Sequence, residues 1–137
     1  MAKKNIEVSG HNIIPFLASI TKYMESKGLE LTPLPKVTIS KSTEYANDVF
    51  GKTAFYNPQE NTITLFVAGR HIKDVLRSFA HEMIHHNQYT TGMFDDSHLS
   101  ALNDPKYAEN DKHMMKMEKD AYLRGNMLFR SWEDQEK

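Results

Sequence analysis

The sequence of 137 residues contains no cysteine, and this absence limits its chemistry. Disulfide bonds are excluded, and any bound metal ion must be held by nitrogen and oxygen atoms. The chain also lacks an excess of charge of either sign, since 17 Lys and Arg stand against 18 Asp and Glu, a formal net charge of −1. No strong electrostatic field therefore favours a nucleic acid or a membrane as partner, and no basic segment is interleaved with aromatic residues.

Long hydrophobic runs, internal repeats and low-complexity segments are also missing. The basic segment MAKKNIEVSG is not followed by the apolar stretch of a signal peptide, and HNIIPFLASI is short and interrupted by Pro15. We therefore expect neither a signal peptide nor a membrane span, and a cytoplasmic location. Apolar residues make up 39% and charged residues 26% of the chain, which predicts a single domain over residues 1–137.

Two segments in the first half of the chain predict strands, and one predicts a helix. Residues 12–28 repeat apolar side chains at helical spacing, with Pro15 suited to the first turn and Gly28 to the end. The segment KVTIS is β-branched and alternating, which is typical of a strand. The segment TAFYNPQENTITLFV predicts a hairpin whose turn is the polar stretch in its middle.

The second half of the chain predicts two helices. Residues 71–90 repeat apolar residues at steps of three and four, and Gly92 ends the pattern. A last helix begins between residues 105 and 112. This order predicts an α+β fold, with a small antiparallel or mixed sheet packed on an N-terminal, a middle and a C-terminal helix.

The middle helix contains the motif H-E-x-x-H, formed by His81, Glu82 and His85. Because residues four apart lie one above the other on a helix, both imidazoles can reach one metal ion from the same face. Glu82 lies about 100° around the helix from His81. A general base for a metal-bound water belongs at that place. The alternative is a chance motif on a surface helix, but an amphipathic helix that follows a strand is the context that the metal site requires.

A catalytic zinc ion needs a third protein ligand and leaves its fourth position to water. The candidates are Glu118, His113, His98, Asp95 and Asp96. We favour Glu118 because it lies between Met114 and Ala121 on the inward side of the last helix, where an unpaired carboxylate is costly. The alternative is that Glu118 belongs to an exposed EKD run and pairs with a lysine.

The motif HEMIH and the later segment MEKDAYLRGN resemble the gluzincin group of zinc metallopeptidases. More narrowly, they are similar to the small single-domain minigluzincins and to metallopeptidase-like proteins of bacterial and phage genomes. The resemblance covers about residues 53–130 and implies a zincin-like fold around an active-site helix. The longer pattern H-E-x-x-H-x-x-G-x-x-H is excluded, because Gln88 and Thr91 replace its glycine and its third histidine.

This resemblance implies the roles of several residues. The zinc ligands would be His81, His85 and Glu118, and Glu82 would be the general base. The substrate would be a peptide or protein, added as a strand along an edge strand at Thr62–Val67.

Thermolysin-like gluzincins have an aspartate four residues after the glutamate ligand, and this chain departs from that pattern. Tyr122 occupies the position, and Asp120 is expected to face elsewhere. Tyr122 lies one turn beyond Glu118 on the same face, so Tyr122 or His113 is a candidate to stabilise an oxyanion.

Two further hypotheses stay open at this point. The first is similarity to SprT-like proteases, which use a third histidine and would favour His98 or His113 over Glu118; the low net charge argues against autonomous DNA binding. The second is a zinc-binding or interaction domain without catalysis, or one that acts only in a larger assembly such as a phage particle or a host complex. A purely structural site needs no base, so Glu82 favours the enzyme.

Overall fold

The computed structural model describes residues 7–8, 10–41, 53–93 and 112–136, and the statements below concern these residues. They form an α+β fold of helices and two small sheets, as the sequence predicts. The smaller sheet is a hairpin of β1 (Glu7–Val8) and β2 (His11–Asn12), joined at Gly10 with a φ of 80°. This hairpin could not be predicted from the sequence, because two-residue strands are too short to produce a periodic pattern.

The larger sheet is mixed and has three strands. β3 (Lys36–Ser40) pairs in parallel with β5 (Thr62–Phe66), and β4 (Ala54–Asn57) pairs with the other side of β5 in antiparallel orientation. The predicted edge strand at Thr62–Val67 is therefore wrong, because β5 is hydrogen-bonded on both sides and the edges are β3 and β4. A peptide cannot be added along β5.

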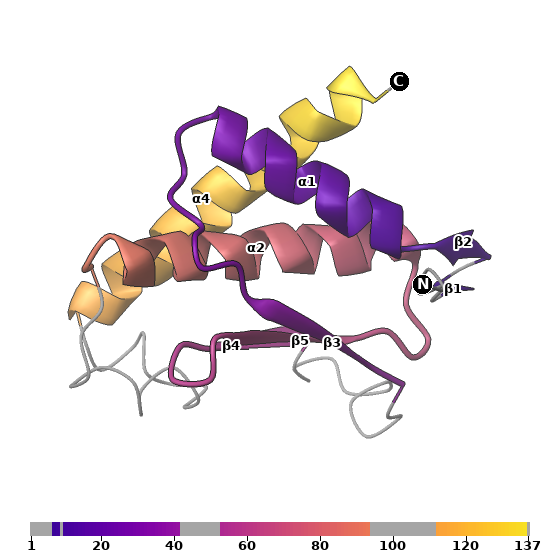
Figure 1. Cartoon of the computed structure of the whole chain (residues 1–137), viewed down its shortest axis with the longest axis horizontal. Helices are drawn as coiled ribbons and strands as arrows, with labels where there is room; N and C mark the ends of the chain where they lie inside the picture. The colour runs from indigo at the N-terminus through magenta and orange to yellow at the C-terminus, as the bar shows by residue number, and fades with distance from the viewer. Residues whose placement is uncertain (1–6, 9, 42–52, 94–111, 137) are drawn as a thin grey trace.

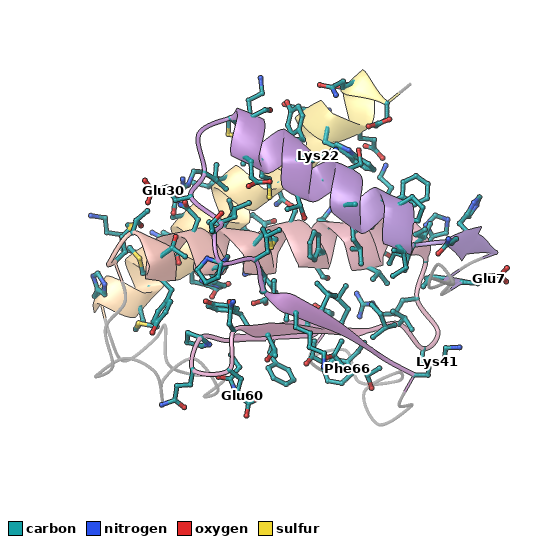
Figure 2. The ribbon with its side chains drawn as sticks, viewed as in Figure 1. Glu7, Lys22, Glu30, Lys41, Glu60 and Phe66 are labelled. Atoms are coloured by element: carbon teal, nitrogen blue, oxygen red, sulfur yellow. The ribbon has the colours of Figure 1, made fainter. Side chains whose placement is uncertain are left out.

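The sheet presents one face to the helices and the other away from them. Ile63 and Leu65 of β5 are fully buried, whereas their neighbours in the strand are half-buried. Figure 2 shows Phe66 on the side of the sheet away from α2 (Ile72–Thr90). This alternation follows from the two-residue period of a strand.

The helix α2 lies at the centre of the fold (Figure 1). It is packed between the sheet and α1 (Ile14–Ser26), and α4 (Lys112–Gln135) crosses it. None of the described helices combines the length and the apolar character that crossing a membrane requires. The core lies around α2 and includes Leu17, Ile20, Met24, Ile63, Leu65, Val75, Phe79, Ala80, Met83, Ile84, Ala121, Phe129 and Trp132.

Local interactions set both ends of α2. Nδ1 of His71 accepts a hydrogen bond from the backbone N–H of Lys73 at 3.1 Å, which satisfies one of the first donors of the helix. At the other end, Gly92 has a φ of 82°, and the backbone N–H of Met93 donates to the carbonyl of Gln88 at 2.8 Å. These two ends place the H-E-x-x-H motif in the middle of a continuous helix of 19 residues.

Candidate metal centre

Within the second half of α2, residues 83–88 are buried on every face of the helix, although the sequence predicts a single buried stripe. The four consecutive residues His85, His86, Asn87 and Gln88 are all buried. Four consecutive positions cover the whole circumference of a helix. α4 covers one side, and the segment after α1 and strand β4 cover the other, so polar groups on every face need partners inside the protein.

His86 satisfies this requirement on the side away from α4. Its Nε2 donates to the carbonyls of Leu31 at 2.9 Å and Pro33 at 3.0 Å, and its Nδ1 accepts from the hydroxyl of Tyr56 at 2.8 Å. Burial lowers the pKa of His86 below its ordinary value, against the smaller opposing effect of the two carbonyls. His86 is therefore a neutral structural histidine and not a third imidazole of the metal centre.

His81, His85 and Glu118 meet between α2 and α4. Nε2 of His81 lies 2.7 Å from Oε1 of Glu118, and Nε2 of His85 lies 3.2 Å from Oε2 of the same carboxylate. The two imidazole rings are 5.0 Å apart between centroids and nearly perpendicular. One ligand atom from each of the three residues lies within 4.8 Å of the other two.

This donor set fits a zinc ion. Zinc prefers nitrogen and oxygen ligands when thiolates are absent, and ligands at about 2.0–2.1 Å in a tetrahedron lie about 3.3 Å apart. The 3.2 Å between Nε2 of His85 and Oε2 of Glu118 is close to that separation, whereas the 2.7 Å between Nε2 of His81 and Oε1 is a hydrogen-bond distance. Among the residues that the structure describes, this is the one cluster of three such groups.

The close approach of α4 to α2 depends on Gly125. A Cβ atom at this position would lie 3.1 Å from Cα and 3.3 Å from the backbone nitrogen of His81. The neighbours are helix backbone, which cannot turn away as a flexible side chain can. The absence of a side chain at Gly125 therefore allows α4 to lie this close to α2 at His81.

Replacing Gly125 with alanine is expected to destabilise the protein by about 1–2 kcal/mol, measured by urea unfolding. Overpacking costs about 1–3 kcal/mol, which outweighs the gain of about 0.5–1 kcal/mol from replacing a helical glycine. Met127→Ala, at an exposed position of the same helix, is the control and should change stability by less than about 0.5 kcal/mol. A Gly125→Ala variant more stable than the parent would show that the helices are not in limiting contact.

A chain of hydrogen bonds extends from His85 to α4. Nδ1 of His85 lies 2.9 Å from Oε1 of Gln88, whose Nε2 donates to the Met117 carbonyl and to Oδ2 of Asp120, both at 2.9 Å. Arg124 binds the same aspartate with two bonds of 2.6 Å. The expectation that Asp120 faces elsewhere is therefore wrong, because it points to α2 and is connected to His85 through Gln88.

The charges around His85 act on its protonation. Burial alone would lower its pKa, but the hydrogen bond that the imidazole donates to Glu118, the negative charges of Glu82 and Glu118, and the hydrogen bond to Gln88 together raise the pKa above the ordinary value. The half-buried Glu82 is one of the two carboxylates whose negative charge raises the pKa of His85. Burial also opposes ionisation of Asp120, but Arg124 and Gln88 lower its pKa.

Tyr122 lies on the same side of α4 as Glu118 but reaches into solvent. Its side chain is 63% exposed. Together they line a hollow of about 550 Å³ whose other described residues are Met115, Lys119 and Leu123. The hollow therefore combines a phenol, a carboxylate and apolar side chains of α4, and Glu118 is the one candidate ligand that lines it.

Of the other candidate ligands, only His113 lies within the described residues, and it is not part of this cluster. His113 lies at the exposed start of α4, where its Nε2 donates to the carbonyl of Met93 at 2.7 Å. His98, Asp95 and Asp96 lie outside the described residues. Comparisons with protein-family models, with curated proteins and with solved structures found no match.

Proposed function

We propose that this chain is a zinc-dependent metallopeptidase in which His81, His85 and Glu118 hold the metal ion. The observation that carries the proposal is the convergence of two imidazoles from α2 and one carboxylate from α4 on a common point. Three protein ligands, with the fourth position left to water or substrate, are the pattern of catalytic zinc sites. The resemblance of the two segments to gluzincins supports the same ligand set.

Glu82 is the residue of this chain that would move the proton. When bound, zinc supplies a water whose pKa is lowered to about 7 and a positive charge that polarises the scissile carbonyl. The Glu82 carboxylate takes the proton from the attacking water as the C–O bond forms. It then gives this proton to the amine nitrogen as the C–N bond breaks.

Tyr122 is the candidate donor to the oxyanion. Its hydroxyl is exposed on the surface that it shares with Glu118, so it is available to a substrate carbonyl. His113 is less suitable, because its Nε2–H is already donated to a backbone carbonyl. The apolar wall of Met115 and Leu123 offers a place for a substrate side chain beside the reacting bond.

The proposal predicts about one zinc ion per chain and cleavage of peptides that stops on chelation. Metal content is measured by elemental analysis after dialysis against zinc. Hydrolysis of casein and of a peptide library is measured with and without a chelator. Activity should return when zinc is added back. The His81→Ala and His85→Ala variants are the matched controls and should lose both the metal and the cleavage.

Two results would contradict the proposal in different ways. If the parent protein binds no zinc above the level of the histidine variants, the metal site is wrong. If zinc is bound but no peptide in the library is cut, the chain is a zinc-binding domain without peptidase activity.

A further inference from the structure

We infer that Gln88 is the positioning residue of this metal centre: it orients the imidazole of His85 and couples that imidazole to Asp120 on α4. The inference rests on the proposed metal site, but it assigns a role to residues that lie outside the ligand set. Gln88 is fully buried, and both ends of its side-chain amide are hydrogen-bonded.

The two acceptors on α4 determine which way the amide points. The carbonyl of Met117 and the carboxylate of Asp120 can only accept hydrogen bonds, so the atom that faces both of them must be the NH₂ group of Gln88. The amide oxygen then faces His85. This assignment follows from the partners and does not depend on distinguishing the oxygen from the nitrogen by eye.

The amide oxygen of Gln88 in turn determines which ring nitrogen of His85 carries a hydrogen. An oxygen that only accepts, at 2.9 Å from Nδ1 of His85, requires a hydrogen on Nδ1. In the neutral form that metal binding needs, the lone pair is therefore on Nε2, the atom that faces Glu118. Gln88 selects the tautomer that can bind a metal on the side of the carboxylate.

The same contacts hold the ring in place and set its relation to the third ligand. Gln88 is attached to α4 at two points, and Arg124 holds Asp120 with two bonds of 2.6 Å. Glu118 lies between those two points in the sequence of α4. One helix therefore supplies the carboxylate ligand and also anchors the residue that orients an imidazole ligand. Hydrogen-bond partners of metal-ligating histidines act in this way.

The test compares Gln88→Met with Asn87→Leu in the full chain. Both changes remove a buried amide from the same turn of α2, but the Asn87 oxygen accepts from the backbone of Glu30 and touches no ligand group. Zinc affinity is measured by competition with a chromophoric chelator, and the geometry by the visible spectrum of the Co²⁺ form. Gln88→Met should weaken zinc binding by about 10–100-fold and alter the Co²⁺ spectrum, whereas Asn87→Leu should change only the unfolding midpoint.

A second readout reports directly on the imidazole. In the zinc-loaded parent, the Nδ1–H of His85 should give an NMR signal that exchanges slowly with water, because the hydrogen is held against a buried oxygen. In the Gln88→Met variant this signal should be absent, or its hydrogen should exchange with water much faster. The Asn87→Leu variant should keep it.

The inference would be overturned if Gln88→Met binds zinc as tightly as the parent with an unchanged Co²⁺ spectrum. The inference would also be overturned if Asn87→Leu weakened zinc binding as much as Gln88→Met does, since the loss of affinity would then come from general packing. The His81→Ala variant keeps the two proposals distinguishable, because it must abolish binding if the metal site is right, whatever Gln88 does.

Discussion

Replacing Glu82 with glutamine is expected to lower peptide hydrolysis by about 10²–10⁴-fold, the contribution of a positioned general base. Glutamine has nearly the same shape but cannot take the proton from the attacking water. Zinc content should stay at the level of the parent protein, because the three ligand groups do not include Glu82. Initial rates on the best substrate of the peptide library and elemental analysis of the same samples measure both quantities.

The matched control for this change is Asp74→Asn. It is also a carboxylate-to-amide substitution on α2, but Asp74 is an exposed residue in the first turn that pairs with Arg77. Full activity is expected from this variant. If Glu82→Gln is as active as Asp74→Asn, another group moves the proton and the assignment of the base is wrong.

Replacing Glu118 with alanine is expected to weaken zinc binding by more than about 100-fold. Loss of an outer hydrogen-bond partner already costs about 10–100-fold, and the loss of a direct ligand costs more. The two imidazoles that remain come from a single helix, so nothing on α4 would hold the ion. Competition with a chromophoric chelator measures the change.

His113→Ala and His98→Ala are the comparisons that identify the third ligand. Both should bind zinc as tightly as the parent protein. Retention of zinc by Glu118→Ala, together with its loss from either histidine variant, would transfer the third ligand to that histidine and favour the SprT-like alternative. Circular dichroism of each variant shows whether the helices are intact before metal is added.

The helices could be predicted because they depend on local periodicity, and the same periodicity marked the three candidate ligand residues. The spacing of His81 and His85 is a property of one helix, and Glu118 is marked by its place beside Met114 and Ala121. The structure brings these three side chains together, with contacts of 2.7 and 3.2 Å between the carboxylate and the imidazoles.

The role of Gln88 and the direction of Asp120 could not be predicted in the same way. Glu118 and Asp120 lie on opposite sides of the buried stripe of α4. Once the periodicity was taken to place Glu118 on the inward side, it placed Asp120 on the outward side. Because α2 crosses over this stripe, it reaches both flanks, with its histidines on one and Gln88 on the other. The crossing is a tertiary feature that periodicity does not contain.

The order of the strands in the sheet could not be predicted from the sequence for a related reason. An alternating segment predicts that a strand exists, but it does not say which strands lie beside it. The hairpin partner β4 was expected next to β5, whereas the parallel partner β3 comes from 22 residues or more earlier in the chain and covers the remaining side.

The enclosure of the second half of α2 has a consequence for how the centre could open. Amide hydrogens in a segment that is covered on every side exchange with solvent only when the whole molecule unfolds. Hydrogen exchange should therefore be slowest at His85 and Gln88 and faster along the outer face of α4. A metal ion held beside these residues would leave on the side of Glu118, whose side chain is 36% exposed, and not through the buried part of α2.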